Sequence, residues 1–130
     1  MNYYTRSKFS KTTNLPFTTI ANYVSRGILE PKVKVGKSRG SSHIFNDHDV
    51  LELLLIRRMV SVGVALKVVY HLMKQFRQKK LIQKIIRQQC DFILIIDQEQ
   101  IESISKDDPF PFEKITQNAT LINWKHSNYI

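Results

Sequence analysis

Cysteine is almost absent from this 130-residue chain, and so are long apolar runs. The single cysteine, Cys90, cannot form a disulfide within the chain, which indicates a reducing compartment. No uncharged apolar run approaches the ~20 residues that a membrane-spanning helix needs. No apolar segment follows the charges of the first residues, so we expect no signal peptide. Together these absences predict a soluble protein located in the cytoplasm and associated with the nucleoid if it binds DNA.

Acidic residues are also scarce. The chain has 11 Asp and Glu against 20 Lys and Arg, a net charge of +9, and its 42% of hydrophobic residues suffice for a core. The charge is uneven: residues 1–45 carry +7, residues 46–90 carry +6 and residues 91–130 carry −4. A balance of this kind favours a polyanionic partner, either nucleic acid or an anionic membrane surface. A basic protein without such a partner is the alternative.

Patterns of catalysis and metal binding are missing as well. The sequence has no glycine-rich phosphate loop, no paired carboxylates in an apolar setting and no nucleophile elbow, so we expect neither an enzyme nor a cofactor. Cys90 stands alone, and the four histidines show no ligand spacing. We interpret Cys90 as a structural thiol and expect no metal site.

The stretch from Thr18 to Gly27 predicts a short helix. Pro16 precedes it, Gly27 favours a left-handed end, and Ile20 and Val24 lie four apart on one apolar stripe. The remaining surface carries polar groups suited to base edges and phosphates, namely Thr18, Thr19, Asn22, Tyr23 and Arg26. Taken alone, the stretch fits either a recognition helix or an ordinary surface helix.

The surroundings favour a helix-turn-helix unit. A helix over residues 6–12 is predicted, with Thr5 as its N-cap and Phe9 as its apolar anchor, and a turn then leads into the second helix. Residues 32–45 begin with alternating Lys and Val, pass through a Gly/Ser/basic stretch and end on Ile-Phe, which predicts a β-hairpin with a cationic tip. A flexible surface loop is the alternative for this segment.

Two further helices follow. Asn46 or Asp47 is expected to cap a helix that runs to about residue 60, and Gly63 marks a tight joint. The next helix is expected to begin near Ala65. Residues 77–90 contain no glycine or proline, so the helical pattern is predicted to continue through them.

This ordered set resembles the DNA-binding domain of the MerR family over about residues 3–76. The matching residues are Tyr4-Thr5, Leu15, Thr19-Ile20 through Tyr23, Arg26 through Leu29, Pro31, His43 through Phe45, Asp49-Val50, Leu53, Ile56-Arg57, Val62 through Val64 and Leu66. The family usually has Arg followed by two Tyr in its recognition helix, where this chain has Ala21, Asn22 and Tyr23. Ser42 and His43 stand where the family has a tyrosine and an arginine of the wing. The resemblance implies DNA binding without supplying the preferred sequence.

We predict one set of residues for contact with double-stranded DNA. Recognition-helix residues would read bases in the major groove, and wing residues would follow the backbone or the adjacent minor groove. The predicted DNA-binding residues are Lys11, Phe17, Thr18, Thr19, Asn22, Tyr23, Arg26, Lys34, Lys37, Arg39, Ser42 and His43.

The last third is interpreted as a dimerisation or interaction region. An apolar stripe over residues 81–86 resembles a short version of the helix through which family members dimerise, and strands are predicted at residues 92–96 and 119–124. These segments expose more apolar surface than a monomer of this size tolerates, which predicts a homodimer. The predicted dimerisation residues are Leu81, Ile82, Ile85, Ile86, Phe92, Leu94 and Ile96.

The sequence therefore predicts a mainly α-helical protein, a winged helix-turn-helix with a β-hairpin wing, followed by a helix and a two-strand appendage. Residues 1–76 would form the DNA-binding domain and residues 77–130 the C-terminal region. The expected function is that of a dimeric, MerR-like transcriptional regulator. Phage excisionases share a similar winged fold, so an architectural DNA-binding protein, an excisionase or a partition factor, is one alternative. A module whose acidic third binds a protein partner is the other.

Overall fold

The computed structural model describes residues 2–32, 44–88, 91–97, 99–105, 108–109, 111, 113 and 116–125, with only the backbone for Gln88 and Phe92. By its internal packing the chain divides into two units, Met1–Arg57 and Arg58–Ile130. The boundary falls inside helix α3 (Asp47–Ser61). These are units of packing. The functional division predicted between residues 76 and 77 stays a prediction.

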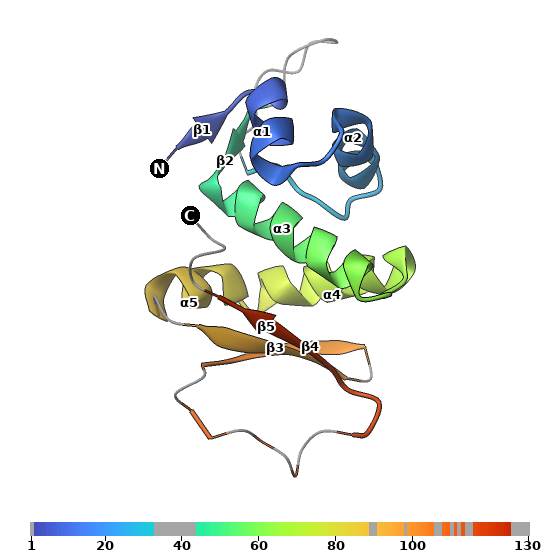
Figure 1. The fold of residues 1–130 in the computed structure, drawn as a ribbon, viewed down its shortest axis with the longest axis vertical. Helices are drawn as coiled ribbons and strands as arrows, with labels where there is room; N and C mark the ends of the chain where they lie inside the picture. The colour runs from blue at the N-terminus through green and yellow to red at the C-terminus, as the bar shows by residue number, and fades with distance from the viewer. Residues whose placement is uncertain are drawn as a thin grey trace. The chain divides into compact units, whose positions relative to one another are not determined.

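The first unit contains two short helices and a two-stranded sheet. Helices α1 (Arg6–Thr13) and α2 (Phe17–Ser25) form the predicted helix-turn-helix. Strand β1 (Tyr3–Tyr4) pairs antiparallel with β2 (Phe45–Asn46), so the chain before α1 is anchored to the chain before α3 (Figure 1). The β1–β2 pairing was not predicted, because a two-residue strand is too short to show an alternating pattern.

The core of the first unit is organised around Phe9. Its ring stacks on the Phe45 ring with centroids 4.0 Å apart, and both side chains are fully buried. Apolar side chains from α2, the following turn and α3 complete this core, including Ile20, Ile28, Leu29, Leu51 and Leu55. The prediction that Phe9 anchors α1 is thus confirmed.

Helix α3 begins at a reciprocal cap. The Asn46 side-chain oxygen accepts a hydrogen bond from the Asp49 N–H at 3.0 Å, and the Asp49 carboxylate accepts one from the Asn46 N–H at 3.0 Å. Two donors that a helix start would leave unpaired are satisfied in this way. The helix ends before Gly63, whose φ of 95° permits the predicted tight joint into α4.

The second unit places two helices on one face of a sheet. Helices α4 (Leu66–Gln78) and α5 (Leu81–Gln88) lie along strands β3 (Phe92–Asp97), β4 (Gln100–Ser105) and β5 (Thr120–Trp124) (Figure 1). The sheet is antiparallel, with β3 in the centre in the order β4-β3-β5. The described part of the chain is therefore mainly helical with small antiparallel sheets, as predicted.

Two predictions for the second unit were wrong. The helix does not continue through residues 77–90, because α4 ends at Gln78 and Lys80 takes a left-handed φ of 53° before α5 starts. The appendage has three strands where two were predicted. Strand β4 was missed because it turns Ser103 and Ser105 to the buried side, so its sequence lacks a clear apolar alternation.

The outer edge of β4 is covered by side chains from the helices. The Gln75 amide donates to the Glu99 carbonyl at 2.6 Å and accepts from the Ile101 N–H at 3.1 Å, as a neighbouring strand would. Lys79 donates to the Ile101 carbonyl at 2.9 Å, and Lys84 donates to the Ser103 carbonyl at 3.3 Å. Such contacts prevent an edge strand from pairing with another chain.

The predicted dimer stripe is a core stripe. Leu81, Ile82 and Ile85 are buried within a single chain, as are Leu94 and Ile96, whereas Ile86 is half-buried. The prediction that this stripe leaves excess apolar surface exposed was therefore wrong, because other parts of the same chain bury the stripe. The Phe92 side chain lies outside the described residues, and dimerisation itself stays a prediction.

Candidate nucleic-acid interface

Helix α1 is fixed at both ends by polar groups. The Thr5 hydroxyl accepts a hydrogen bond from the Lys8 N–H at 3.4 Å, which caps the first turn as predicted. At the other end Asn14 takes a left-handed φ of 55°, and its N–H donates to the Lys11 carbonyl at 3.3 Å. Asparagine tolerates this conformation better than most residues, so the chain leaves α1 in a defined direction.

The turn between the two helices is closed by hydrogen bonds. The Leu15 N–H donates to the Ser10 carbonyl at 3.2 Å, and the Ser10 hydroxyl donates back to the Leu15 carbonyl. The Thr13 hydroxyl donates to the Phe9 carbonyl at 2.7 Å, and the Arg57 guanidinium donates to the Thr13 carbonyl at 2.7 Å. The turn is thereby held to α3 as well as to α1.

Helix α2 begins after Pro16 and ends before Gly27, as predicted. The Pro16 carbonyl accepts a hydrogen bond from the Ile20 N–H at 3.2 Å. Gly27 has a φ of 73°, and the Ile28 N–H then donates to the Tyr23 carbonyl at 2.9 Å. A left-handed glycine followed by such a bond satisfies carbonyls at the helix end. Because Ile20 and Ile28 are also buried, the orientation of α2 is well determined.

One face of α2 is exposed, and its residues recur at helical spacing from Thr18. They are Thr18, Ala21, Asn22, Ser25 and Arg26, which we call the α2 polar face. Thr18, Asn22 and Arg26 were predicted, whereas Ala21 and Ser25 were missed. The helical spacing from Thr18 places both residues on this face. Alanine carries no polar group, and Ser25 was not among the predicted residues. Thr19 is half-buried at the border of this face.

The α2 polar face offers the chemistry of base recognition. An asparagine amide can pair with adenine, an arginine fork with guanine, and an alanine methyl can contact the methyl group of thymine. The Ser25 hydroxyl donates to the Asn22 carbonyl at 3.0 Å, so Ser25 is partly engaged with its own helix. Groups held on a rigid helix keep the geometry that bidentate base contacts require.

Tyr23 does not belong to this face, and its predicted exposed position was wrong. Its side chain is only 7% exposed and lies in the apolar core. The reason is its register, since Tyr23 follows the buried Ile20 by three residues and therefore faces the same side of the helix.

Phe17 and Lys11 lie beside the start and the approach of α2. The Arg6 guanidinium stands over the Phe17 ring, 4.0 Å from its centroid, and the ring is half-buried. Contacts of this kind hold a cation in place at little cost. Arg6 is exposed and was not predicted as a site residue, and Lys11 is exposed in the last turn of α1. Both add positive charge near α2.

The wing lies outside the described residues. This applies to Lys34, Lys37, Arg39, Ser42 and His43, whose predicted DNA contacts stay predictions. The described chain ends before the wing at Lys32 and resumes at Ile44, next to strand β2.

Lys32, the last described residue before the predicted wing, contacts α3. Its ammonium group lies 2.6 Å from a Glu52 carboxylate oxygen and 3.3 Å from an Asp49 oxygen, and both carboxylate side chains are fully buried. The Lys32 N–H donates to Asp49 at 3.2 Å. Burial raises the pKa of Asp49, while the Asn46 N–H and the Lys32 charge oppose the rise. Lys32 therefore holds the chain that leaves the second helix against α3, and its ammonium group is engaged by these carboxylates.

No group of three or more His, Cys, Asp and Glu among the described residues is arranged to hold a metal ion, and Cys90 lies outside them. No helix in the described part of the chain is both long and apolar enough to cross a membrane.

Comparison with known proteins completes this description. No curated protein matches the chain. The family described as MerR HTH family regulatory protein matches residues 4–75, which is more than half of the 130 residues and takes in α1, α2, α3 and most of α4. The chain therefore belongs to the MerR helix-turn-helix family of DNA-binding transcriptional regulators.

Proposed function

We propose that this MerR-family protein is a sequence-specific, dimeric regulator that reads DNA with the α2 polar face. The observation that carries the proposal is a row of exposed polar groups on a helix whose two ends are fixed by Pro16 and Gly27. Asn22 lies in the middle of that row and is the residue we assign to base reading. Lys34, Lys37 and Arg39 of the wing would supply phosphate contacts, which position a protein without reading sequence.

The length of α2 supports a dimer. Nine residues span about 13 Å, which matches roughly four base pairs of the major groove. A site of about four base pairs is far too common for selection among ~10⁶ or more competing sites in a genome. Two copies related by a two-fold axis would read two half-sites, as dimeric helix-turn-helix proteins do.

The sheet edge at β5 is the surface we assign to that dimer. Strand β4 is covered by Gln75, Lys79 and Lys84, which leaves β5 as the other edge of the three-stranded sheet. Leu121 on β5 is 48% exposed although it is large and apolar. Antiparallel pairing of β5 with its copy would be self-complementary, as a two-fold interface requires. The buried 81–86 stripe plays no part in this interface.

The base-reading role is tested with Asn22→Ala. Its affinity is measured over a salt series for the DNA site that the parent protein binds most tightly, here called the best site, and for a scrambled duplex. We expect a loss of roughly 1–3 kcal/mol on the best site and much less on the scrambled one. Gln78→Ala, which removes an exposed amide from the end of α4, is the matched control. Lys37→Ala should weaken both duplexes alike and lower the salt slope by about one. Equal losses on both duplexes with Asn22→Ala would show that α2 is not the reader.

A footprint separates the proposal from its alternatives. One pseudo-palindrome of ~20 base pairs fits a dimeric regulator, whereas tandem direct repeats fit an architectural protein. No footprint would favour a protein-interaction module.

Sedimentation at micromolar concentration should give twice 15.3 kDa, and Leu121→Lys should shift the chain toward the monomer. A monomer at these concentrations would refute the dimer without touching the assignment of α2.

A further inference from the structure

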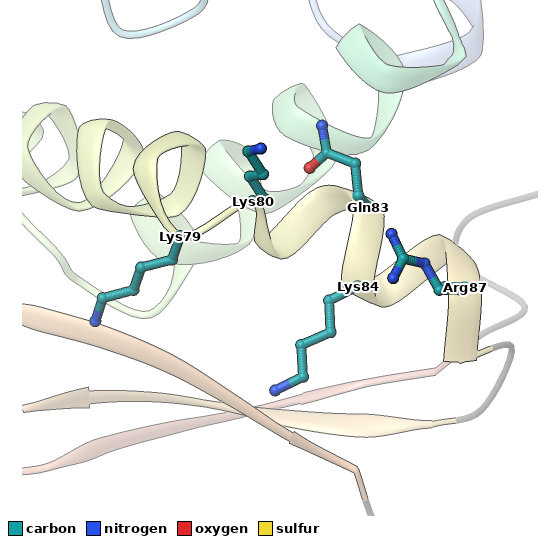
Figure 2. Close-up of a pocket in the computed structure, with 5 residues that line it drawn as sticks. All are labelled: Lys79, Lys80, Gln83, Lys84 and Arg87. Atoms are coloured by element: carbon teal, nitrogen blue, oxygen red, sulfur yellow. The ribbon is translucent and has the colours of Figure 1, made fainter.

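The joint between α4 and α5 surrounds an open concavity of about 600 Å³. Its lining consists of Lys79, Lys80, Gln83, Lys84 and Arg87, and contains no carboxylate. Figure 2 shows Lys79 and Lys84 extending toward the strands, and Arg87 turning back toward Gln83 and Lys84. The volume falls within the ~300–1,000 Å³ typical of small-molecule sites, although the lining is far more cationic than most.

Two of the cations lie on α5 itself. Lys84 and Arg87 are three residues apart on this helix, which places them on neighbouring positions of its surface, and Lys79 and Lys80 lie at the joint before it. Like charges at this spacing repel each other. Residues 66–88, which cover both helices, contain seven Lys and Arg and no Asp or Glu. The repulsion is therefore not relieved by any acidic residue of α4 or α5.

Much of the hydrogen-bonding capacity of these cations is unused. The Lys79 ammonium group has three N–H donors, of which one donates to the Ile101 carbonyl and one to the Glu102 carboxylate at 2.6 Å. The Lys84 ammonium group uses one N–H, which donates to the Ser103 carbonyl. Among the described residues, neither the Lys80 ammonium group nor the Arg87 guanidinium has a hydrogen-bond or ion-pair partner. Glu102 thus offsets one of the four charges, and about three remain to attract an anion.

The site is held on a firm base. Leu81 and Ile85, on the other side of α5, are buried, and Lys84 and Lys79 are tied to backbone carbonyls of β4. Lys80 is placed by its left-handed backbone, a conformation that a lysine adopts only when its surroundings impose it. Charged donors fixed in this way lose little freedom when a ligand binds.

We propose that this concavity binds a small molecule carrying two or more phosphate groups. Lysine ammonium groups and an arginine fork are the donors that phosphate oxygens attract most strongly. A single negative charge would leave the site unbalanced, whereas a diphosphate or a triphosphate matches about three unpaired cations. Cations gathered around one concavity favour a compact ligand over duplex DNA, which spreads its charges along its axis, one per ~1.7 Å.

The proposal is tested by titration calorimetry on the full chain in the absence of DNA, so the outcome does not depend on the proposed regulator function. The probes are inorganic pyrophosphate and ATP, with adenosine as the uncharged control. We expect both anions to bind with Kd below about 1 mM and adenosine not to bind. Lys80→Ala and Arg87→Ala should each weaken ATP binding by about tenfold or more. Unchanged melting temperatures would show that both variants fold.

Lys67→Ala is the matched control, because it removes the same charge from α4 outside the concavity. We expect it to change ATP affinity by less than about twofold. An equal loss for Lys67→Ala and Lys80→Ala would mean diffuse attraction and would overturn the proposal. It would also be overturned if neither anion binds, or if the Lys80 and Arg87 variants leave ATP binding intact. Failure of ATP to bind, with both variants weakening DNA binding, would assign the cluster to DNA phosphates.

Discussion

Replacing Lys32 by methionine removes an ammonium group that contacts two buried carboxylates while keeping most of the apolar part of the side chain. Breaking a buried ion pair by removing one partner costs about 3–5 kcal/mol, because the other charge is left uncompensated. The Lys32 side chain is 29% exposed, so water already screens part of the interaction. We therefore expect Lys32→Met to lower the free energy of unfolding by about 2–3 kcal/mol at neutral pH.

The pH dependence of this loss is the sharper test. Because burial raises the pKa of Asp49 above its usual 3.8, the folded chain holds that proton more tightly than the unfolded chain does. Stability is therefore lost as the pH rises from 3.8 through the folded-state pKa. Lys32 opposes the rise in this pKa, so its removal raises the pKa further and enlarges the loss. The difference between Lys32→Met and the parent should be small near pH 4 and largest near pH 7.

Urea denaturation followed by circular dichroism at both pH values measures this difference. Lys67→Met, an exposed lysine on α4, should change stability by less than about 0.5 kcal/mol at either pH. Adding Glu52→Gln to Lys32→Met should recover part of the loss, because one of the two buried charges that lost the Lys32 contact disappears. A loss that is equal at the two pH values, or that stays under about 1 kcal/mol at neutral pH, would contradict this account of the cluster.

Two further predictions separate core from surface. Tyr23→Ala should lower the free energy of unfolding by about 3 kcal/mol or more, since the ring is buried, whereas Asn22→Ala should change it by less than about 0.5 kcal/mol. Similar small effects for both would place Tyr23 back on the surface. Gln75→Ala should cost about 1–3 kcal/mol by leaving backbone groups of β4 unpaired, and should promote concentration-dependent association seen by light scattering. Identical behaviour of Gln75→Ala and Gln78→Ala would refute the role of Gln75 as an edge cover.

Local sequence signals predicted the helix-turn-helix well. Pro16 and Gly27 bound α2, Thr5 caps α1, and Asn46 caps α3, each through a property of one residue that tertiary packing does not override. Gly63 marked the joint between α3 and α4 for the same reason. Where a residue type restricts the backbone by itself, the sequence is a sufficient guide to the structure.

Where the deciding interaction is long-range, the sequence was a poor guide. The break at Lys80 carries no glycine or proline, and a lysine is held there in a left-handed conformation. Strand β4 was missed because serine occupies two of its buried positions, Ser103 and Ser105, so the strand shows no clear apolar alternation. Tyr23 was assigned to the polar face because its hydroxyl group suggested exposure, although its spacing from Ile20 places the ring inside.

Helix α5 shows that an apolar stripe does not by itself indicate which surface covers it. The stripe at residues 81–86 has the spacing of a dimerisation helix, but eight residues make only about two turns, too few for a stable helix pair in isolation. Strands β3, β4 and β5 arrive later in the chain and provide an apolar face, and the stripe is covered within the same molecule. The rest of the α5 surface then carries Lys84 and Arg87, beside Lys79 and Lys80 at the joint with α4. Because the stripe is buried, we assign the proposed dimer interface to the β5 edge and the proposed anion site to the α4–α5 joint, and the two sets of variants test these proposals separately.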